Sequence, residues 1–479
     1  MEPVVSVAEM RAIDADAQRS VPLETLLDRA GSAVAAEALH IMGGAYGRRV
    51  AVVAGKGNNG ADGRVAAERL RRRGARVALV NATDAPDRLP AGLDLVIDAA
   101  YGTGFHGSYA APATDAPVLA VDIPSGLDGD TGTAEGGGGS AVATVTFAAL
   151  KPGLLLGAGP LRSGRVRVAD IGLDCSRATA WLVTDADVAA APLGRGRESH
   201  KWRSALGLVA GAPGMMGAPG FSVRGAQRAG AGMVRLCVPG AGPRDLPVSE
   251  AVSTDLPADW AGAALEWVSR CRAVVVGPGL GRAETTQAAV RALAARAEVP
   301  LLIDADGLYA LGRDASKVLA GRTAPTVLTP HDGEFQTLTG SAPGPDRLGA
   351  VRRLAADCGA VVLLKGSTTV VADPEGRVLI AASGSSRLAT AGTGDVLSGV
   401  IGAFLAQGLE PLLAAGLGAH VHGRAASRGR PVGLVAGDLP DLVSDVLGEL
   451  AGPAPAHTAG VGGRHPDVGA VAAAGAGTS

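Results

Sequence analysis

The sequence predicts a chain of two α/β domains, and three observations support this prediction. Its 479 residues exceed the ~250 to 300 residues at which a single hydrophobic core stops growing. Short runs rich in Val, Leu and Ile alternate with stretches of helical length, which is typical of parallel strands joined by crossover helices. The alternation stops at residues 192–198, PLGRGRE, which lack apolar periodicity. We therefore expect domains at residues 1–193 and 198–451 and a disordered, Gly-, Ala- and Pro-rich tail at 452–479.

The first half begins with apolar residues at helical intervals over residues 7–42. The periodicity then changes to that of strands, with a helix expected over 62–73. The expected strands are 50–54, 77–80, 93–97, 118–123, 142–147 and 166–171. This order predicts a doubly wound sheet.

The second half repeats the alternation and has a strongly apolar helical run at 396–405. Its expected strands are 207–211, 233–238, 273–276, 300–304, 326–328, 361–364 and 369–372. These elements predict a second α/β domain.

The amino-acid composition excludes several classes of binding partner for this protein. A net charge of -2 argues against a nucleic-acid-binding protein, and we interpret the basic run at 69–76 as the solvated end of a helix. The sequence shows no signal peptide at its start and no apolar run of ~18 residues, so we expect no membrane association. Four scattered cysteines suit a reducing, cytoplasmic environment.

Polar loops follow four of the expected strands in the first half. They are GKGNNGADG at 55–63, Asp98 with the loop at 101–108, Asp122 and Ser125 in VDIPSG, and Lys151 after TVTFAAL. Ligands of open parallel sheets bind at the carboxyl ends of the strands, so these loops predict a site. The glycine-rich loop is also compatible with a tight turn capped by Asn.

Taken in order, these loops resemble the NAD(P)H-hydrate epimerase domain, which has a Rossmann-like fold. The resemblance implies a general acid/base at Asp122 assisted by Lys151, and a K⁺ ion held by Asn59, Asp98 and Ser125. Ala61 stands where the family has Gly, and a positive φ there would alter the loop. His106 is also compatible with a polar loop residue outside the chemistry. The residues implied to bind the hydrated nucleotide are Asn58, Asn59, Gly60, Ala61, Asp62, Gly102, Thr103, Gly104, Phe105, His106, Gly107, Ser108 and Asp122.

In the second half, TAGTGD at 390–395 immediately precedes an apolar helix. A glycine-rich loop at a helix N-terminus aims main-chain donors at negative charge, and Asp395 is placed to act as a base. Companion motifs are VGPGLG at 276–281, IDADGL at 303–308, TPHDGEF at 329–335 and LKGSTT at 364–369. Asp304 and Asp306 suit either Mg²⁺ coordination or a helix cap, and His331 suits either the site or a turn cap.

This set resembles the ADP-dependent NAD(P)H-hydrate dehydratase of the ribokinase-like fold. The resemblance implies phosphoryl transfer to the C6 hydroxyl followed by loss of phosphate, with Asp395 as the base and Mg²⁺ on the nucleotide. The implied nucleotide-binding residues are Lys365, Gly366, Ser367, Thr368, Thr369, Ser385, Ser386, Arg387, Leu388, Ala389, Thr390, Ala391, Gly392, Thr393 and Gly394. The implied hydrate-binding residues are Ala218, Gly279, Thr329, Pro330, His331, Asp332, Gly333, Glu334, Phe335 and Asp395.

Together the two resemblances imply a repair enzyme that epimerises (R)- and (S)-NAD(P)HX and dehydrates the S form with ADP, giving AMP and phosphate. Its partners would be NADHX or NADPHX and ADP, and we expect a homo-oligomer. Two alternatives remain. One is a ribokinase-like vitamin or sugar kinase with an N-terminal nucleotide-binding domain, and the other gives the first domain only a nucleotide-sensing or partner-binding role.

Overall fold

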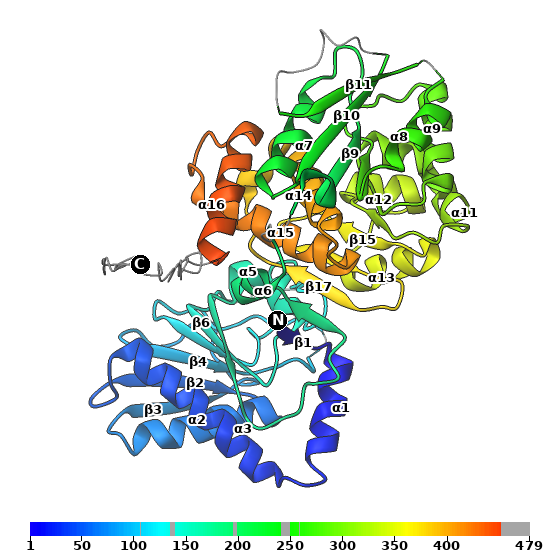
Figure 1. Ribbon diagram of the computed structural model, residues 1–479. Helices are drawn as coiled ribbons and strands as arrows, with labels where there is room; N and C mark the ends of the chain where they lie inside the picture. Colours follow the sequence, from blue (N-terminus) through cyan, green and yellow to red (C-terminus); the bar gives the residue numbers. More distant parts are fainter. Residues whose placement is uncertain (106, 135–138, 195–198, 241–249, 258, 452–479) are drawn as a thin grey trace, which may run out of the picture.

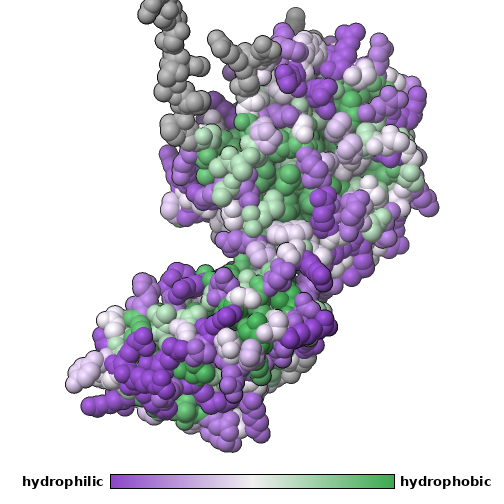
Figure 2. Space-filling view, turned by 60° about the horizontal axis from the view of Figure 1, so that its bottom comes forward, coloured by the Kyte–Doolittle hydropathy of each residue, from purple (hydrophilic) through white to green (hydrophobic). Residues whose placement is uncertain are grey.

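The computed structural model describes residues 1–105, 107–134, 139–194, 199–240, 250–257 and 259–451. These residues form two lobes, each built on its own β-sheet, which meet at a narrow waist (Figures 1 and 2). The expected tail at 452–479 and His106 lie outside the described residues. Among the helices of the described ranges, none combines the length and apolar character needed to cross a bilayer.

The smaller sheet has six parallel strands in the order β3-β2-β4-β5-β6-β7. They are β2 (Arg49–Ala54), β3 (Arg76–Asn81), β4 (Leu95–Ala99), β5 (Val118–Val121), β6 (Ala143–Phe147) and β7 (Arg165–Ala169). All six strands expected in the first half are therefore present. Most of their ends differ from the expected ones by one or two residues; β4, for example, begins at Leu95, two residues later than expected, and β5 ends at Val121, which leaves Asp122 in the loop.

The helical pattern at residues 7–42 forms two helices, α1 (Val7–Ala17) and α2 (Leu23–Met42). Pro22 is the N-cap of α2. Proline has no backbone N–H and so cannot continue a helix from its N-terminal side, but it is tolerated at a helix start. A third helix, α3 (Asn58–Arg71), begins directly in the glycine-rich loop and packs on α2. Two single-turn helices, α4 (Pro152–Leu155) and α5 (Gly159–Arg162), connect β6 to β7.

The larger sheet has the order β1-β8-β17-β16-β15-β14-β13-β12-β9-β10-β11. The run from β15 to β11 is parallel, and β16 and β17 are added in antiparallel fashion. These strands are β9 (Ala205–Val209), β10 (Met233–Pro239), β11 (Val252–Leu256), β12 (Ala273–Val276), β13 (Leu301–Ile303), β14 (Thr326–Leu328), β15 (Val361–Leu364), β16 (Thr369–Ala372) and β17 (Val378–Ala381). Of these, β11 and β17 were not expected from the sequence.

The edge of this sheet is built by the first half of the chain. Strand β8 (Ala180–Leu182) pairs in parallel with β17, and β1 (Glu2–Val4) pairs with β8. Both strands have three residues, too few to show the alternation by which strands are recognised in a sequence. The chain therefore crosses from lobe to lobe before the expected boundary at 193–198.

Helices cover both faces of the larger sheet (Figure 1). They are α6 (Asp185–Ala190), α7 (Gly217–Arg228), α8 (Ala261–Val268), α9 (Glu284–Arg296), α10 (Asp306–Leu311), α11 (Ala315–Leu319), α12 (Asp332–Thr339), α13 (Arg347–Cys358), α14 (Thr393–Ala406), α15 (Pro411–Arg428) and α16 (Leu439–Ala451). Short 3₁₀ turns are η1 (Lys201–Ser204), η3 (Gly312–Asp314), η4 (Ser386–Leu388) and η5 (Ala436–Asp438).

The helix that follows the TAGTGD motif is buried in the core and packs closely on α7. A Cβ added at Gly399 of α14 would lie 2.1 Å from the carbonyl oxygen of Ser222 in α7. Glycine at this position therefore sets the spacing of the two helices, and with it the position of the α14 N-terminus.

We predict that Gly399→Ala separates α7 from α14. Overpacking of a core costs about 1–3 kcal/mol, so the midpoint of thermal unfolding should fall by several degrees. The control is Gly262→Ala in α8, where an added Cβ meets nothing within 4 Å. Alanine favours a helix there, and an equal loss of stability in both variants would contradict the packing argument.

Candidate active sites

The first candidate site is a cavity of about 770 Å³ in the N-terminal lobe. It opens at the carboxyl ends of β2, β4, β5 and β6, where the sequence placed the four polar loops. Helix α1 forms another wall with Arg11 and Asp14, which the sequence analysis missed. The sequence gives no sign that Arg11 and Asp14 face a cavity, because the side of α1 that faces the cavity is decided by how the helix packs on the rest of the lobe.

Asp122 and Lys151 form a buried ion pair in this cavity, with 2.9 Å between Oδ1 and Nζ. Only 1% of the Lys151 side chain is exposed, and its ammonium also donates to Thr146 Oγ1 at 2.8 Å and to the Phe147 carbonyl at 3.0 Å. Asp122 Oδ2 accepts from the N–H of Thr103 at 3.0 Å and from its hydroxyl at 2.9 Å. Asp122 also has φ of 68°, an unusual conformation for a residue other than glycine.

The carboxylates of this cavity differ in their acidity. Burial opposes ionisation of Asp122, but the Lys151 charge and the Thr103 donors together hold its pKa below the usual value. Asp62 is buried without a cation, and burial and the charges of Asp122 and Asp14 raise its pKa to about 8. Burial likewise raises the pKa of Asp14. At neutral pH the cavity therefore holds an ionised carboxylate beside a protonated one.

The three residues implied to hold K⁺ lie around the same strand ends. Ser125 donates to Asp98 through its hydroxyl at 2.6 Å and its N–H at 3.0 Å. Burial raises the pKa of Asp98, and no ion pair to it is found among the described residues. Both polar side-chain atoms of Asn59 are buried without a hydrogen-bond partner. An oxygen-rich, buried group with an uncompensated charge is compatible with a hard cation.

Only some of the other residues expected in the first site line the cavity. Asn58, Gly102, Thr103, Gly104 and Phe105 line the cavity. A Cβ at Gly102 would lie 2.9 Å from Asp122 Oδ2 and 3.2 Å from Asn59 Cγ, so these motifs converge. Gly60, Ala61, Gly107 and Ser108 are not among the lining residues. Ala61 lies within α3 and does not have a positive φ, so its methyl group leaves the loop unaltered.

The second candidate site surrounds the N-terminus of α14. Gly392 is its N-cap in the left-handed conformation, with φ of 91°, and Thr393 fixes the turn by donating to the Leu388 carbonyl at 2.8 Å. Asp395 lies in the first turn. Burial, the charge of Asp304 and other nearby carboxylates raise the pKa of Asp395 to about 7, against the opposing effect of Lys365. A carboxyl group with such a pKa suits a general base near neutral pH.

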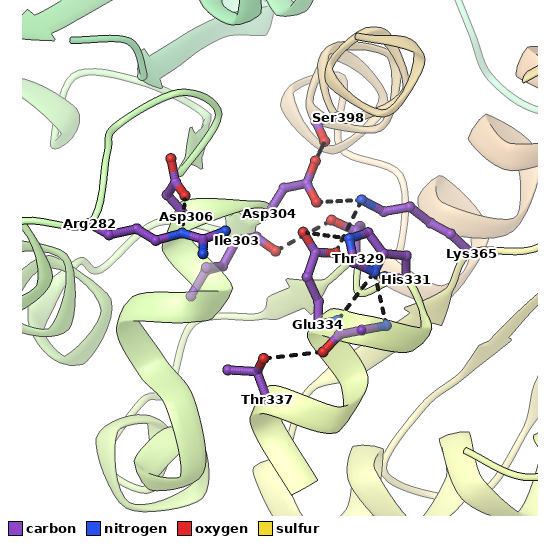
Figure 3. Close-up of polar contacts among 11 residues, drawn as sticks. Arg282, Ile303, Asp304, Asp306, Thr329, His331, Glu334, Thr337, Lys365 and Ser398 are labelled. Carbon is purple, nitrogen blue, oxygen red and sulfur yellow. Dashed lines mark hydrogen bonds and ion pairs between the residues drawn. The ribbon is translucent and has the colours of Figure 1, made fainter. Parts of the chain in front are cut away.

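Asp304 is the centre of a buried polar network that includes Lys365 and Ser398 (Figure 3). Asp304 accepts from Lys365 Nζ and from Ser398 Oγ, each at 2.6 Å, and Lys365 Nζ lies 3.7 Å from Glu334. Burial disfavours the Lys365 ammonium, but the charges of Asp304 and Glu334 outweigh it and raise its pKa. A Cβ at Gly394 would lie 3.5 Å from Lys365 Nζ, so the LKGSTT and TAGTGD motifs meet here.

Asp306 and His331, which the sequence left open between a role in the site and a cap, both have structural partners. Asp306 accepts from the N–H of Gly281 at 2.9 Å and from Arg282 at 3.0 Å (Figure 3). His331 is the N-cap of α12, and its Nδ1 accepts from the N–H groups of Gly333 at 3.0 Å and Glu334 at 3.2 Å. Neither arrangement excludes contact with a ligand. Among the described residues, no cluster of three or more His, Cys, Asp or Glu side chains is arranged to hold a metal ion.

Some of the remaining residues expected in the second site lie close to one another, and others do not. A Cβ at Gly279 would contact Ala218 at 3.1 Å, and one at Gly384 would lie 2.5 Å from the Ser367 carbonyl, next to the 385–394 loop. Phe335, in contrast, is buried in the core rather than lining an open site. His420 and His422 are buried, and burial lowers the pKa of His422 to about 4. Ser398 was missed, because nothing in an apolar helix marks one serine as a partner of a distant aspartate.

Comparisons with known proteins identify the families that the two halves of the chain match. The family model described as NAD(P)H-hydrate dehydratase matches residues 206–447, and the one described as YjeF-related protein N-terminus matches residues 23–91 and 80–153. The bifunctional NAD(P)H-hydrate repair enzyme of Mycobacterium tuberculosis H37Rv is 41% identical over 85% of this chain and 90% of its own length. The Salinibacter ruber enzyme of the same name is 36% identical over 94% and 97%.

Solved structures match the C-terminal part of the chain. A ribokinase-like superfamily protein from Enterococcus faecalis aligns with a TM-score of 0.50 and 23% identity, covering 57% of this chain and 98% of its own. An ADP/ATP-dependent NAD(P)H-hydrate dehydratase from Bacillus subtilis, co-crystallised with ATP and Mg²⁺, aligns with a TM-score of 0.49 and 30% identity over 56% and 97%. The ribokinase-like fold expected for the second half is confirmed. By its two family matches and its near-full-length relatives, the chain belongs to the family of bifunctional NAD(P)H-hydrate repair enzymes.

Proposed function

We propose that the two sites catalyse successive steps of nicotinamide nucleotide repair. The N-terminal cavity interconverts (R)- and (S)-NAD(P)HX, and the site at α14 dehydrates the S form with ADP, releasing AMP and phosphate. The observation that carries the proposal is the pairing of an ionised carboxylate with a protonated one in the first cavity and a near-neutral carboxyl group, Asp395, in the second.

In the first site we assign general base catalysis to Asp122. Lys151 and Thr103 keep the carboxylate ionised and hold it against the cavity wall, so it can accept the proton of the C6 carbinol. Asp62, protonated below about pH 8, is available as a hydrogen-bond donor on the same cavity. Lys151 is fully engaged by Asp122, Thr146 and Phe147, which supports a positioning role for it.

We further propose that a K⁺ ion binds between Asn59, Asp98 and Ser125. The unpartnered amide of Asn59 and the buried carboxyl group of Asp98, which has no ion pair among the described residues, support this placement. When bound, the ion would favour the ionised form of Asp98 and help to orient the anionic nucleotide. The proton transfer itself is assigned to the side chains of this chain.

In the second site, phosphorylation turns a poor leaving group into a good one. Asp395 takes the proton of the C6 hydroxyl while that oxygen attacks the terminal phosphoryl group of ADP, and AMP leaves. The C6–O bond then breaks as phosphate departs, and loss of a proton from C5 forms the C5=C6 double bond that restores the ring of NAD(P)H. N–H groups of residues 391–394 and the α14 dipole face the phosphoryl group, and Lys365 lies beside them.

The proposed nucleotide loops are residues 365–369 and 385–394, and Mg²⁺ would accompany the phosphates. Mg²⁺ commonly binds through substrate phosphates and only one or two carboxylates, which agrees with the lack of a larger acidic cluster among the described residues. Domain limits at 193 and 198, a cytoplasmic location and a homo-oligomeric state stay predictions.

The proposal is tested by incubating the protein with mixed NADHX epimers, ADP, Mg²⁺ and K⁺ and following NADH absorbance. Both epimers should be recovered as NADH. Asp122→Asn should still recover the S fraction but slow recovery of the R fraction by about 10²- to 10⁴-fold, the usual contribution of a general base. Asparagine tolerates the positive φ at this position, so the fold should be retained.

The matched control for that variant is Asp115→Asn, which removes an exposed carboxylate paired with Arg88. It should behave as the wild type. If Asp122→Asn recovers both epimers at the wild-type rate, the catalytic assignment of Asp122 fails. If the wild type itself recovers only the S fraction, the first lobe is not an epimerase. A phosphorylated product that persists without forming NADH would instead identify the second lobe as a kinase.

The raised pKa of Asp395 predicts a pH dependence for dehydration. A base must be ionised, so kcat/KM should rise with pH through about 7 and then level off. Asp395→Asn should abolish dehydration at every pH while ADP binding, measured by calorimetry, is retained. A kcat/KM that is flat between pH 5.5 and pH 8.5, measured on pure S epimer, would remove Asp395 from the role of base.

Removal of K⁺ should affect only the first step. Replacing K⁺ with tetramethylammonium is expected to slow epimerisation several-fold without changing dehydration of the S epimer. Asp98→Asn should make epimerisation insensitive to K⁺, because it removes the charge assigned to the ion. A K⁺ response that Asp98→Asn leaves intact would place the ion elsewhere.

A further inference from the structure

A separate cavity of about 550 Å³ lies between the two lobes. Its floor comes from the C-terminal lobe and includes Gly366, Ser367 and Thr368 of the proposed nucleotide loop, together with Lys365 and Arg347. Its opposite wall comes from the N-terminal lobe, from Leu155, Leu156, Gly157 and Pro160. Residues from both sides of the expected domain boundary therefore line one space.

The two walls are fixed to each other by direct bonds. The hydroxyl of Thr368 donates to the carbonyl oxygen of Leu155 at 2.7 Å, and this contact is buried. Pairing of β8 with β17 holds the lobes together at the same edge of the larger sheet. The wall is therefore built into the fold and does not depend on a loose contact between lobes.

The chemistry of the two walls differs. The N-terminal wall offers the apolar side chains of Leu156 and Pro160. The C-terminal floor offers main-chain groups of residues 366–368 and two ion pairs, Lys365 with Asp304 and Arg347 with Asp332. Ligand pockets typically measure ~300 to 1,000 Å³ and combine apolar walls with a few polar groups. A space with an apolar side and a polar, main-chain-rich side suits the adenosine part of a nucleotide, whose base has flat apolar faces and a hydrogen-bonding edge.

We propose that residues 155–160 of the N-terminal lobe complete the adenosine nucleotide site of the C-terminal lobe. ADP bound along residues 365–369 would then contact both halves of the chain. The inference rests on the proposed function, because it assigns a further wall to the same nucleotide site. It also joins the two sites physically: α4 begins directly after Lys151, the partner of Asp122, and ends at Leu155 on the cavity wall.

The test is Pro160→Trp, which places an indole in the cavity. Because the indole would occupy space assigned to the nucleotide, the dissociation constant of ADP, measured by calorimetry, should rise about tenfold or more. The matched control is Leu161→Trp, at a neighbouring position that is 84% exposed and does not line the cavity. It should bind ADP as the wild type does.

Pro160→Ala is the second variant, in case the indole disturbs the fold. It removes apolar contact from the wall without adding bulk, and is expected to weaken ADP binding about two- to threefold. Epimerisation in the absence of nucleotide, measured on the same samples, reports that the N-terminal lobe is folded.

The outcomes separate this inference from the proposed function. If the wild type binds ADP and both Pro160 variants bind it equally well, the composite site is wrong and the repair function stands. If the wild type neither binds ADP nor dehydrates the S epimer, the proposed function fails first. The inference would also be overturned if Leu161→Trp weakened ADP binding as much as Pro160→Trp does. The loss of affinity would then not come from filling the cavity.

Discussion

Each lobe is organised around a buried carboxylate held to a lysine ammonium. In the N-terminal lobe the pair is Asp122 and Lys151 at 2.9 Å, and in the C-terminal lobe it is Asp304 and Lys365 at 2.6 Å. Removing one partner of such a pair leaves an uncompensated buried charge, which typically costs about 3–5 kcal/mol. Each pair therefore constrains the strand ends and loops that carry it, and the rest of each site is arranged around that constraint.

The two lobes are joined by hydrogen-bonded strand pairing as well as by the connecting chain. Strands β1 and β8, from the first half, add hydrogen-bonded edges to the sheet of the second half. Nearby, Asp185 at the start of α6 contacts His420 and Arg424 of α15. An edge strand in a large sheet is exposed to unwanted pairing, and these additions cover it. The same junction brings α4 against the loop at 365–369.

Much of this architecture could be predicted from the sequence, because parallel strands buried on both faces show as continuous apolar runs. All six strands of the smaller sheet were expected, as were the loops that converge on Asp122. The three-residue strands β1 and β8 carry no such signal. The partners of site residues, such as Ser398 for Asp304 and Asp14 near Asp62, depend on packing between distant segments. Local patterns do not encode that information.

The two lysine pairs also decide which neighbouring carboxyl group titrates near neutral pH. Burial raises the pKa of Asp62 to about 8, and the charge of Asp122, which Lys151 stabilises, adds to this rise. In the C-terminal lobe, the charge of Asp304 contributes to raising the pKa of Asp395 to about 7. Pairs of carboxyl groups with separated pKa values are a general means of assigning acid and base roles. The lysines thus favour the ionised form of one carboxylate, and the charge of that carboxylate adds to the effect of burial in raising the pKa of its neighbour.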